Sequence, residues 1–162
     1  MLLPDGSKLD KARGITLTAL VEPKGKGRPR FGKGGKTHTD EKTVDWKKRF
    51  LSATLVARMR LRPMAARFRG EPLFVAIVLG YPRAKSNKSW WCNVKIDNDN
   101  AEKNVWDALQ DQTARELVGN RVVRAVNEGL IRDDHEIVSN ACMKQWAEKP
   151  YIEIHITPII KE

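Results

Sequence analysis

Apolar residues along the chain recur with the spacing of strands and helices. Residues 15–21 alternate apolar side chains with threonines and predict a strand. Residues 73–79 form an unbroken apolar run, which predicts a central strand that is covered on both faces of its sheet. Residues 136–146 and 151–157 predict two further strands, the second with alternating isoleucines.

Helical spacing separates these strands at two places. The first helix follows Thr39, ends at Pro63 at the latest, and carries an apolar stripe. That predicted stripe consists of Val44, Leu51, Leu55 and Met59. The second helix begins at Asp99, and residues 110–132 are expected to lengthen it or to add a short helix. The order of elements predicts one α/β (α+β) domain, a mixed β-sheet with helices packed on it.

Two segments stand apart from this pattern. Residues 1–14 are polar and broken by proline and glycine, which predicts a flexible arm before a domain that spans residues 15–162. Residues 23–36 read P-K-G-K-G-R-P-R-F-G-K-G-G-K, with six lysines or arginines, five glycines and no acid. Such a composition excludes a regular element and predicts a mobile cationic loop.

The whole chain, and not only this loop, carries an excess of positive charge. The 162 residues carry a formal charge of +10 and a pI near 9.8, which favours an anionic partner, and nucleic acid is the commonest polyanion in cells. No apolar run is long enough to span a membrane, and the first residues do not resemble a secretion signal. Cys92 and Cys142 lack metal-ligand spacing and fit a reducing compartment. We therefore expect a cytoplasmic protein without membrane partners.

Asp97 and Asp99 are unexpected in so basic a chain. Residues two apart in an extended segment point the same way, so both carboxylates can converge on one spot. Their mutual repulsion would be relieved by a divalent cation, and oxygen ligands suit Mg²⁺ or Mn²⁺. In the alternative interpretation, Asp99 only caps the helix that follows.

Lys103 and the pair Asp133-Asp134 extend this polar chemistry. Asn100, Lys103 and Asp107 are spaced three and four residues apart, so they share one stripe of the helix. Lys103 would then point toward the aspartates, where a cation can stabilise charge on a phosphate. Alternatively, Lys103 forms an ordinary surface ion pair with Asp107. Asp133-Asp134 adds carboxylates just before a strand.

The stretches D-N-D-N-A-E-K-N-V-W-D-A-L and G-L-I-R-D-D-H-E-I-V resemble the RusA family of Holliday-junction endonucleases. The family pattern is D-x-D-N-x-x-K-x-x-x-D-A-L followed by D-D ahead of a strand, and many relatives carry a basic P-K-x-R-P-R-F loop. Every fixed position is met, at Asp97, Asp99, Asn100, Lys103, Asp107, Ala108, Leu109, Asp133 and Asp134. The resemblance spans roughly residues 15–157. The segment between Leu109 and Asp133 is longer than is usual for the family.

This resemblance implies a homodimeric, Mg²⁺- or Mn²⁺-dependent endodeoxyribonuclease that resolves four-way (Holliday) junctions by paired phosphodiester hydrolysis. Carried over by position, Asp97, Asp99 and Asp134 are the metal ligands, and Lys103 is the essential catalytic cation. Whether Asp133 or Asp134 is the principal ligand stays open, as does the number of ions. Relatives are often encoded by phages or prophages, which implies a role in recombination or repair in a bacterial host.

DNA contacts are expected from the cationic loop and from an aromatic pair. The loop supplies Lys24, Lys26, Arg28, Arg30, Lys33 and Lys36. Trp90 and Trp91 precede the aspartates, and we expect at most one of them to stack on a base while the other packs in the core. Two other functions stay open: a metal-dependent nuclease for flaps or other branched DNA, and a non-catalytic junction-binding protein.

Overall fold

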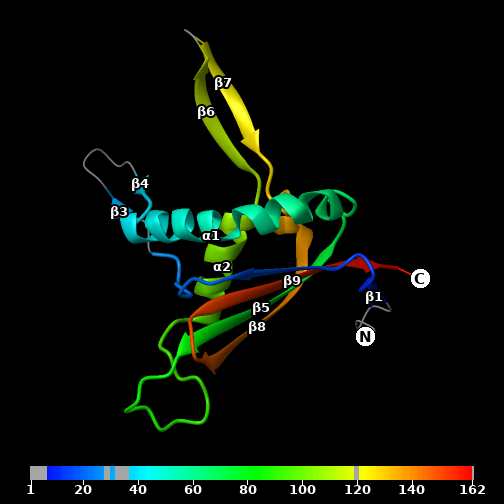
Figure 1. The fold of residues 1–162 in the computed structure, drawn as a ribbon. Coiled ribbons are helices and arrows are strands. Elements are labelled where there is room, and N and C mark those ends of the chain that lie inside the picture. Colours follow the sequence, from blue (N-terminus) through cyan, green and yellow to red (C-terminus); the bar gives the residue numbers. More distant parts are fainter. Residues whose placement is uncertain (1–6, 28–29, 32–36, 119–120, 162) are drawn as a thin grey trace.

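A mixed β-sheet forms the centre of the protein (Figure 1). The computed structural model describes residues 7–27, 30–31, 37–118 and 121–161. In the described residues the sheet has five strands: β1 (Lys8–Leu9), β2 (Ile15–Ala19), β5 (Leu73–Pro82), β8 (Ile137–Ala147) and β9 (Tyr151–Ile160). Strand β9 pairs antiparallel with β1, β2 and β5, and β5 pairs parallel with β8. The predicted α+β fold with a mixed sheet is confirmed.

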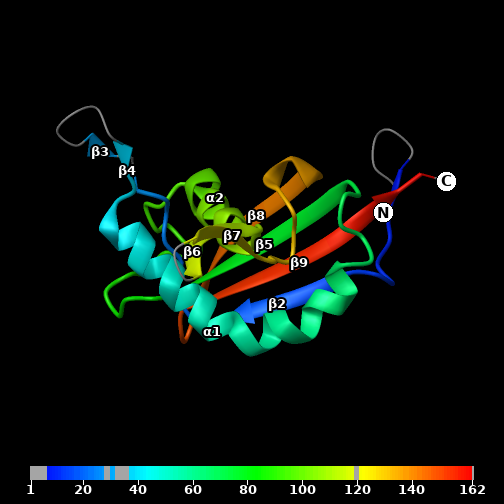
Figure 2. The same ribbon diagram turned by 90° about the horizontal axis from the view of Figure 1, so that it is seen from above.

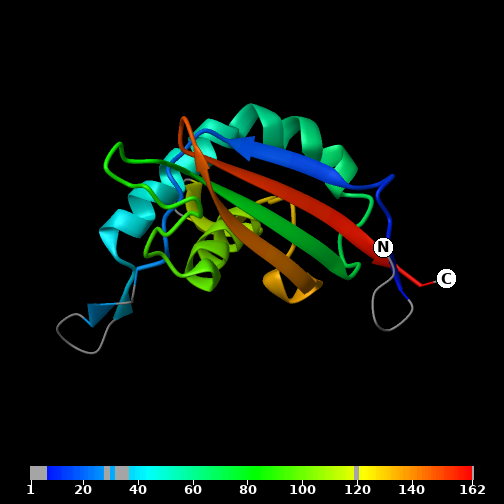
Figure 3. The ribbon, with the colours of Figure 1, turned by 90° about the horizontal axis from the view of Figure 1, so that it is seen from below.

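Both helices, α1 (Glu41–Ala65) and α2 (Asn98–Leu109), cover the same face of this sheet. Figure 2 views them in front of the strands, and Figure 3 shows the strands from the side that carries neither helix. In β5, the side chains of Leu73, Val75, Ile77 and Leu79 are buried, whereas those between them are partly exposed. The central position of this strand is confirmed, but the expectation that both of its faces are covered is wrong.

Helix α1 packs through a different stripe from the one predicted. Trp46, Phe50 and Thr54 are buried, and the two aromatic rings stack with centroids 5.2 Å apart. Most of the predicted stripe is exposed instead, namely Val44, Leu55 and Met59. The larger aromatic side chains bury more apolar area, which decides the rotation of the helix. The helix also continues two residues past Pro63, although proline has no N–H and gives up one intrahelical hydrogen bond there.

Residues 7–14 are part of the folded body rather than of a flexible arm. Strand β1 extends the sheet along β9, and Ser7 is buried. The Arg13 guanidinium contacts Asp10 and Glu71, each at 2.7 Å. The predicted arm is therefore wrong for these residues, and its first part, 1–6, lies outside the described residues.

The long middle segment forms a β-hairpin, not the additional helix that we predicted. Strands β6 (Gln112–Val118) and β7 (Arg121–Asn127) pair antiparallel, and the hairpin projects from the body beyond α1 (Figure 1). The sequence R-V-V-R-A-V-N is rich in β-branched residues, which favour strands. Gly-Asn between two such runs is a pair typical of hairpin turns, although residues 119–120 themselves lie outside the described part.

The base of this hairpin is fastened to the end of α2. The Gly129 N–H donates to the Asp111 carboxylate at 2.8 Å, and Arg69 forms an ion pair with the same aspartate. A Cβ at position 129 would lie 2.0 Å from the Leu109 carbonyl oxygen, so only glycine fits this close approach.

The cationic loop contains one short strand, β3 (Arg30–Phe31), which pairs antiparallel with β4 (Thr37–His38) directly after the loop. The prediction that this loop has no regular element is therefore wrong. In the parts of the chain that the structure describes, no helix is long and apolar enough to cross a membrane.

Candidate functional site

The N-terminal end of α2 presents Asp97 and Asp99 to solvent. The helix begins at Asn98, and Asp97 occupies the cap position with extended backbone angles (φ −67°, ψ 135°) but without a capping hydrogen bond from its side chain. Asp99 lies inside the first turn, so the alternative that it caps the helix is wrong. Both carboxylates are exposed, and the Asp97 carboxylate makes no hydrogen bond or ion pair with any described residue.

Lys103 lies one turn further along the same stripe. Its Nζ is 3.8 Å from Asp99 Oδ2, and the two side chains are 57% and 68% exposed. The alternative in which Lys103 pairs with Asp107 is wrong, because Asp107 Oδ2 lies 2.5 Å from Lys26 Nζ instead. The first turns of α2 thus present two acids and one ammonium group together to solvent.

Polar contacts with β8 hold this end of α2 in place. Lys144 Nζ donates to the carbonyl oxygens of Val94 and Ile96 at 3.1 and 2.9 Å. The Asn98 side chain donates to the Cys142 carbonyl at 3.2 Å, and the buried Glu102 accepts from Asn140 at 2.9 Å. Sequence reasoning missed these positioning residues. The polar residues Asn98 and Glu102 on the inner side of an amphipathic helix could have indicated such contacts.

A short 3₁₀ turn, η1 (Asp134–Glu136), carries the second acidic pair. The buried Glu136 carboxylate accepts from the Gly70 N–H at 2.9 Å and from the Arg132 N–H at 3.0 Å. Glu136 therefore fixes the turn from inside, while Asp133 and Asp134 remain exposed on its surface. From the sequence, we predicted Glu136 only as the first residue of a strand.

The two carboxyl groups of this pair influence each other. A hydrogen bond with Asp133 raises the pKa of Asp134, and partial burial and repulsion by Asp133 and then Asp107 act in the same direction. The pKa of Asp133 is lowered by hydrogen bonds, first with Asp134 and then with His135. Two acids that compete for one proton form a site where a cation would relieve repulsion.

The predicted metal ligands are brought together as two separate pairs. The Leu130 N–H donates to the carbonyl oxygen of Leu109, the last residue of α2, at 2.8 Å, so the second pair, a few residues further on, lies toward the C-terminal end of this helix. Eight residues at 1.5 Å each place Asp99 about 12 Å along the helix axis from Asp107. Within the described residues, no three acidic, histidine or cysteine side chains are grouped so that they could hold one metal ion. The carboxylate oxygens suit Mg²⁺ or Mn²⁺ chemically, but the shared site of Asp97, Asp99 and Asp134 stays a prediction.

The root of the cationic loop runs along α2. The Asn104 side chain donates to the Lys24 carbonyl at 2.9 Å, and the Lys26 N–H donates to the Asn100 carbonyl at 3.1 Å. With the ion pair between Lys26 and Asp107, these contacts place the start of the loop beside the polar stripe.

A contact with α1 completes this anchorage, since the Gly27 N–H donates to Thr43 Oγ1 at 2.9 Å. Of the other predicted DNA contacts, Arg28, Lys33 and Lys36 lie outside the described residues, and for Arg30 only the backbone is described.

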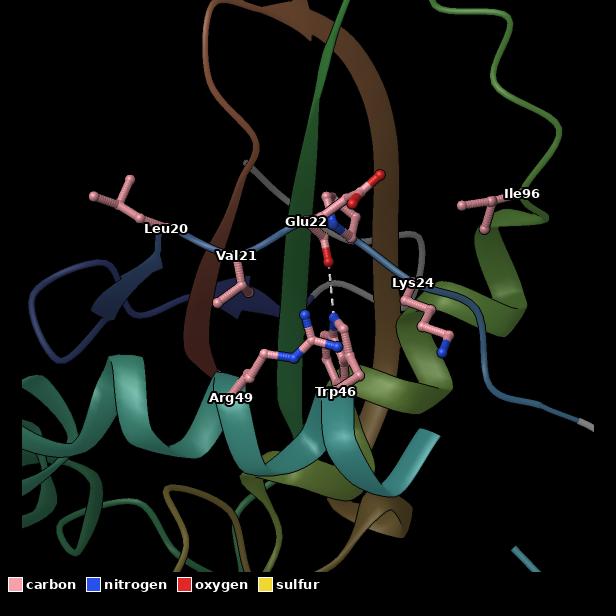
Figure 4. A pocket seen from close by; sticks show the side chains of 8 residues that line it. Leu20, Val21, Glu22, Lys24, Trp46, Arg49 and Ile96 are labelled. Atoms are coloured by element: carbon pink, nitrogen blue, oxygen red, sulfur yellow. Dashed lines mark hydrogen bonds between the residues drawn. The ribbon is translucent and has the colours of Figure 1, made fainter. Parts of the chain in front are cut away.

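A cleft of about 500 Å³ opens beside this root (Figure 4). The chain leading from β2 forms one wall, α1 forms another, and Ile96 points in from across. Trp46 Nε1 donates to the Glu22 carbonyl at 2.8 Å and ties the two walls together. Lys24 and Arg49 add positive charge. Since Ile96 directly precedes Asp97, the cleft lies next to the first acidic pair.

Comparison with known proteins adds one finding. The family model described as endodeoxyribonuclease RusA matches residues 21–116, a range that contains the cationic loop, Asp97, Asp99 and Lys103. No curated protein matches the chain.

Proposed function

The chain belongs to the RusA endodeoxyribonuclease family, and from this premise we propose that it resolves four-way DNA junctions by metal-dependent phosphodiester hydrolysis. The observation that carries the proposal is the exposed group of Asp97, Asp99 and Lys103 on the first turns of α2. The Asp97 side chain makes no capping hydrogen bond, Asp99 lies inside the first turn, and the only ion pair of Asp99 with a described residue is the long one to Lys103. The net charge of +10 favours a polyanionic substrate.

Asp97, Asp99 and Asp134 would hold Mg²⁺ or Mn²⁺, since they supply the hard oxygen ligands that these ions prefer. When bound, such an ion activates water and offsets charge on the scissile phosphate and the leaving 3′ oxygen. The Lys103 ammonium would bind a non-bridging phosphate oxygen and stabilise the negative charge that develops there. The expected products are a 5′-phosphate and a 3′-hydroxyl.

A homodimer would unite the two acidic pairs. Asp97 and Asp99 lie at one end of α2 and Asp133-Asp134 toward the other, so a second copy can bring its own Asp134 to the first pair. Two-fold symmetry would then create two equal sites, which matches the two opposed strands of a junction. We therefore propose that each cation site is shared between two copies of the chain.

The function is tested with junction, flap and linear duplex DNA of matched sequence, each incubated with the protein and Mg²⁺. We expect symmetric paired nicks in the junction alone. Equal cleavage of flaps would favour the broader branched-DNA nuclease. Absence of cutting with retained junction binding would favour the non-catalytic protein.

Shared sites are tested by mixing two inactive variants, Asp99→Asn and Asp134→Asn. If sites are shared, each mixed dimer has one site with both substitutions and one site with neither, so nicking of a single strand should return. If each site lies within one chain, every site in the mixed dimer contains a substitution and the mixture stays inactive. The unmixed variants are the controls, and subunit exchange is verified with differently tagged chains.

A further inference from the structure

The loop between β5 and α2, residues 83–97, exposes two tryptophans. Trp90 is 84% exposed and Trp91 is 55% exposed. The ring centroids lie 5.3 Å apart, and the ring planes are inclined at 81°. The expectation that one of them packs in the core is wrong. Tryptophan is among the costliest side chains to leave in water, so two exposed indoles side by side indicate a binding surface.

The polar residues of this loop hold it in a defined shape. Asn87 Nδ2 donates to Asn93 Oδ1 at 2.9 Å, and Ser89 Oγ donates to the Trp91 carbonyl at 2.9 Å. Trp146 Nε1, on β8, donates to the Ser89 carbonyl at 3.1 Å and fastens the loop to the sheet. The loop therefore turns its amides and hydroxyls to itself and both indole rings to the solvent.

The charges around these rings favour a polyanion. Residues 82–96 contain no acid, and four exposed cations accompany the tryptophans: Arg83, Lys85, Lys88 and Lys95. Aromatic rings interleaved with lysine and arginine are typical of surfaces that bind unpaired nucleic acid, where rings stack on bases and cations contact phosphates. An interface for a protein would instead be depleted of lysine.

We propose that Trp90 and Trp91 form a stacking platform for nucleobases that are unpaired at the branch point, next to the strand to be cut. The inference rests on the proposed function, because the loop leads directly into Asp97. Bases in a continuous duplex hide their faces in the stack, whereas bases at a crossover can expose them. With perpendicular rings, one indole stacks on a given base and the other supports it from the side. The platform would thus help the protein to distinguish branched from linear DNA.

The test measures permanganate oxidation of thymines placed at the crossover, because this reagent attacks thymines that are unstacked. The Asp99→Asn variant should bind the junction without cutting it, and it therefore serves as the parent. We expect binding of the parent to increase oxidation at the crossover. Adding Trp90→Ala and Trp91→Ala should remove the increase and weaken junction binding by about 5- to 150-fold, the range for loss of one stacked base.

Matched variants separate stacking from folding. Replacing both tryptophans with phenylalanine keeps aromatic faces and should restore most of the oxidation. Val56→Ala truncates an exposed apolar residue on α1 and should behave as the parent. Melting curves verify that each variant is folded.

Three results would overturn the platform: unchanged oxidation in the double alanine variant, equal losses of binding to junction and linear duplex, or a loss of dimers that marks the loop as a protein interface. The same measurements distinguish failure of the platform from failure of the proposed function. If the unsubstituted protein cuts junctions but thymine oxidation never changes, only the platform is wrong. If thymines become reactive but no strand is cut, only the nuclease is wrong.

Discussion

The two ends of α2 carry carboxylates of different character. At the C-terminal end, Asp107 pairs with Lys26 and Asp111 holds Arg69 and the Gly129 N–H. At the N-terminal end, Asp97 has no partner among the described residues and Asp99 has only Lys103 at 3.8 Å. The first group joins segments of the fold. The second group joins nothing that the structure describes.

This difference separates acids that build the protein from acids that are available to a ligand. Adjacent unpaired carboxylates contribute repulsion, and they persist where a bound cation or substrate compensates. Asp133 and Asp134 combine both characters, because Glu136 fixes their turn from inside while their own carboxyl groups remain exposed. We therefore propose a chemical role for Asp97, Asp99 and Asp134, whereas the contacts of Asp107, Asp111 and Glu136 are structural.

The largest expected effect is the loss of cleavage in Asp99→Asn. Removing a metal ligand should lower the rate of junction cutting by at least about 10³-fold, since metal-ion stabilisation contributes several kcal/mol to the transition state. Thermal stability and junction binding should stay unchanged, because the carboxylate supports no fold contact. Single-turnover cleavage and melting curves measure both properties. Asp45→Asn, an exposed acid on α1, is the matched control and should cut normally. A comparable rate for the two variants would remove the distinction between the ends of α2.

Glu136→Ala, in contrast to Asp99→Asn, should lower the stability of the protein. The substitution leaves the Gly70 and Arg132 N–H groups without their buried acceptor, and we expect a loss of about 2–4 kcal/mol in the free energy of unfolding. Urea denaturation measures this loss. Glu136→Gln retains one acceptor oxygen and should lose less. A stable alanine variant would show that the turn carrying Asp134 is held by other contacts.

Sequence reasoning located the acids but not their partners. Helical spacing predicted that Lys103 points toward the aspartates, because helical geometry is local. Asp97 and Asp99 were expected to converge from an extended segment, whereas α2 begins between them at Asn98. Asp107 forms an ion pair with Lys26, which lies far away along the chain and inside a glycine-rich loop. Nothing local encodes such a contact, so the surface pair with Lys103 looked equally good.

For the fold, too, features set by local sequence were predicted correctly and features set by distant contacts were not. Alternating strands such as β2 and β9 were predicted well, because the period of two is visible in the sequence. The buried face of α1 was predicted incorrectly. Both faces of this helix contain apolar residues, and only packing against the sheet decides which face is buried. The β6–β7 hairpin was misread as helical because the β-branched residues of its second strand were given too little weight.

A smaller effect should distinguish Lys24 from Lys26. Lys26 is already neutralised by Asp107, so Lys26→Met should change the salt dependence of DNA binding little. Lys24→Met should reduce the slope of log Kd against log salt by about 0.9, the value for one phosphate contact. Asp107→Asn frees the Lys26 ammonium and should increase the slope by a similar amount. Equal slopes for both lysine variants would show that the ion pair opens when DNA binds.

The smallest expected effect is that of Asp134→Asn. This substitution should stabilise the protein, whereas most substitutions destabilise it. Because the pKa of Asp134 is raised in the folded protein, the folded state retains a proton that the unfolded chain releases, and stability falls as the pH rises from about 4 through the raised pKa. Asp134→Asn removes this loss, so the variant should melt at a higher temperature than the unsubstituted protein at pH 7 and at the same temperature at pH 3. Mg²⁺ should raise the melting temperature of the unsubstituted protein but not that of the variant, because a ligand stabilises only the state that binds it. Melting curves across pH, with and without Mg²⁺, measure both effects. A variant that is less stable at pH 7 would place Asp134 with Asp111 and Glu136, among the acids that build the fold.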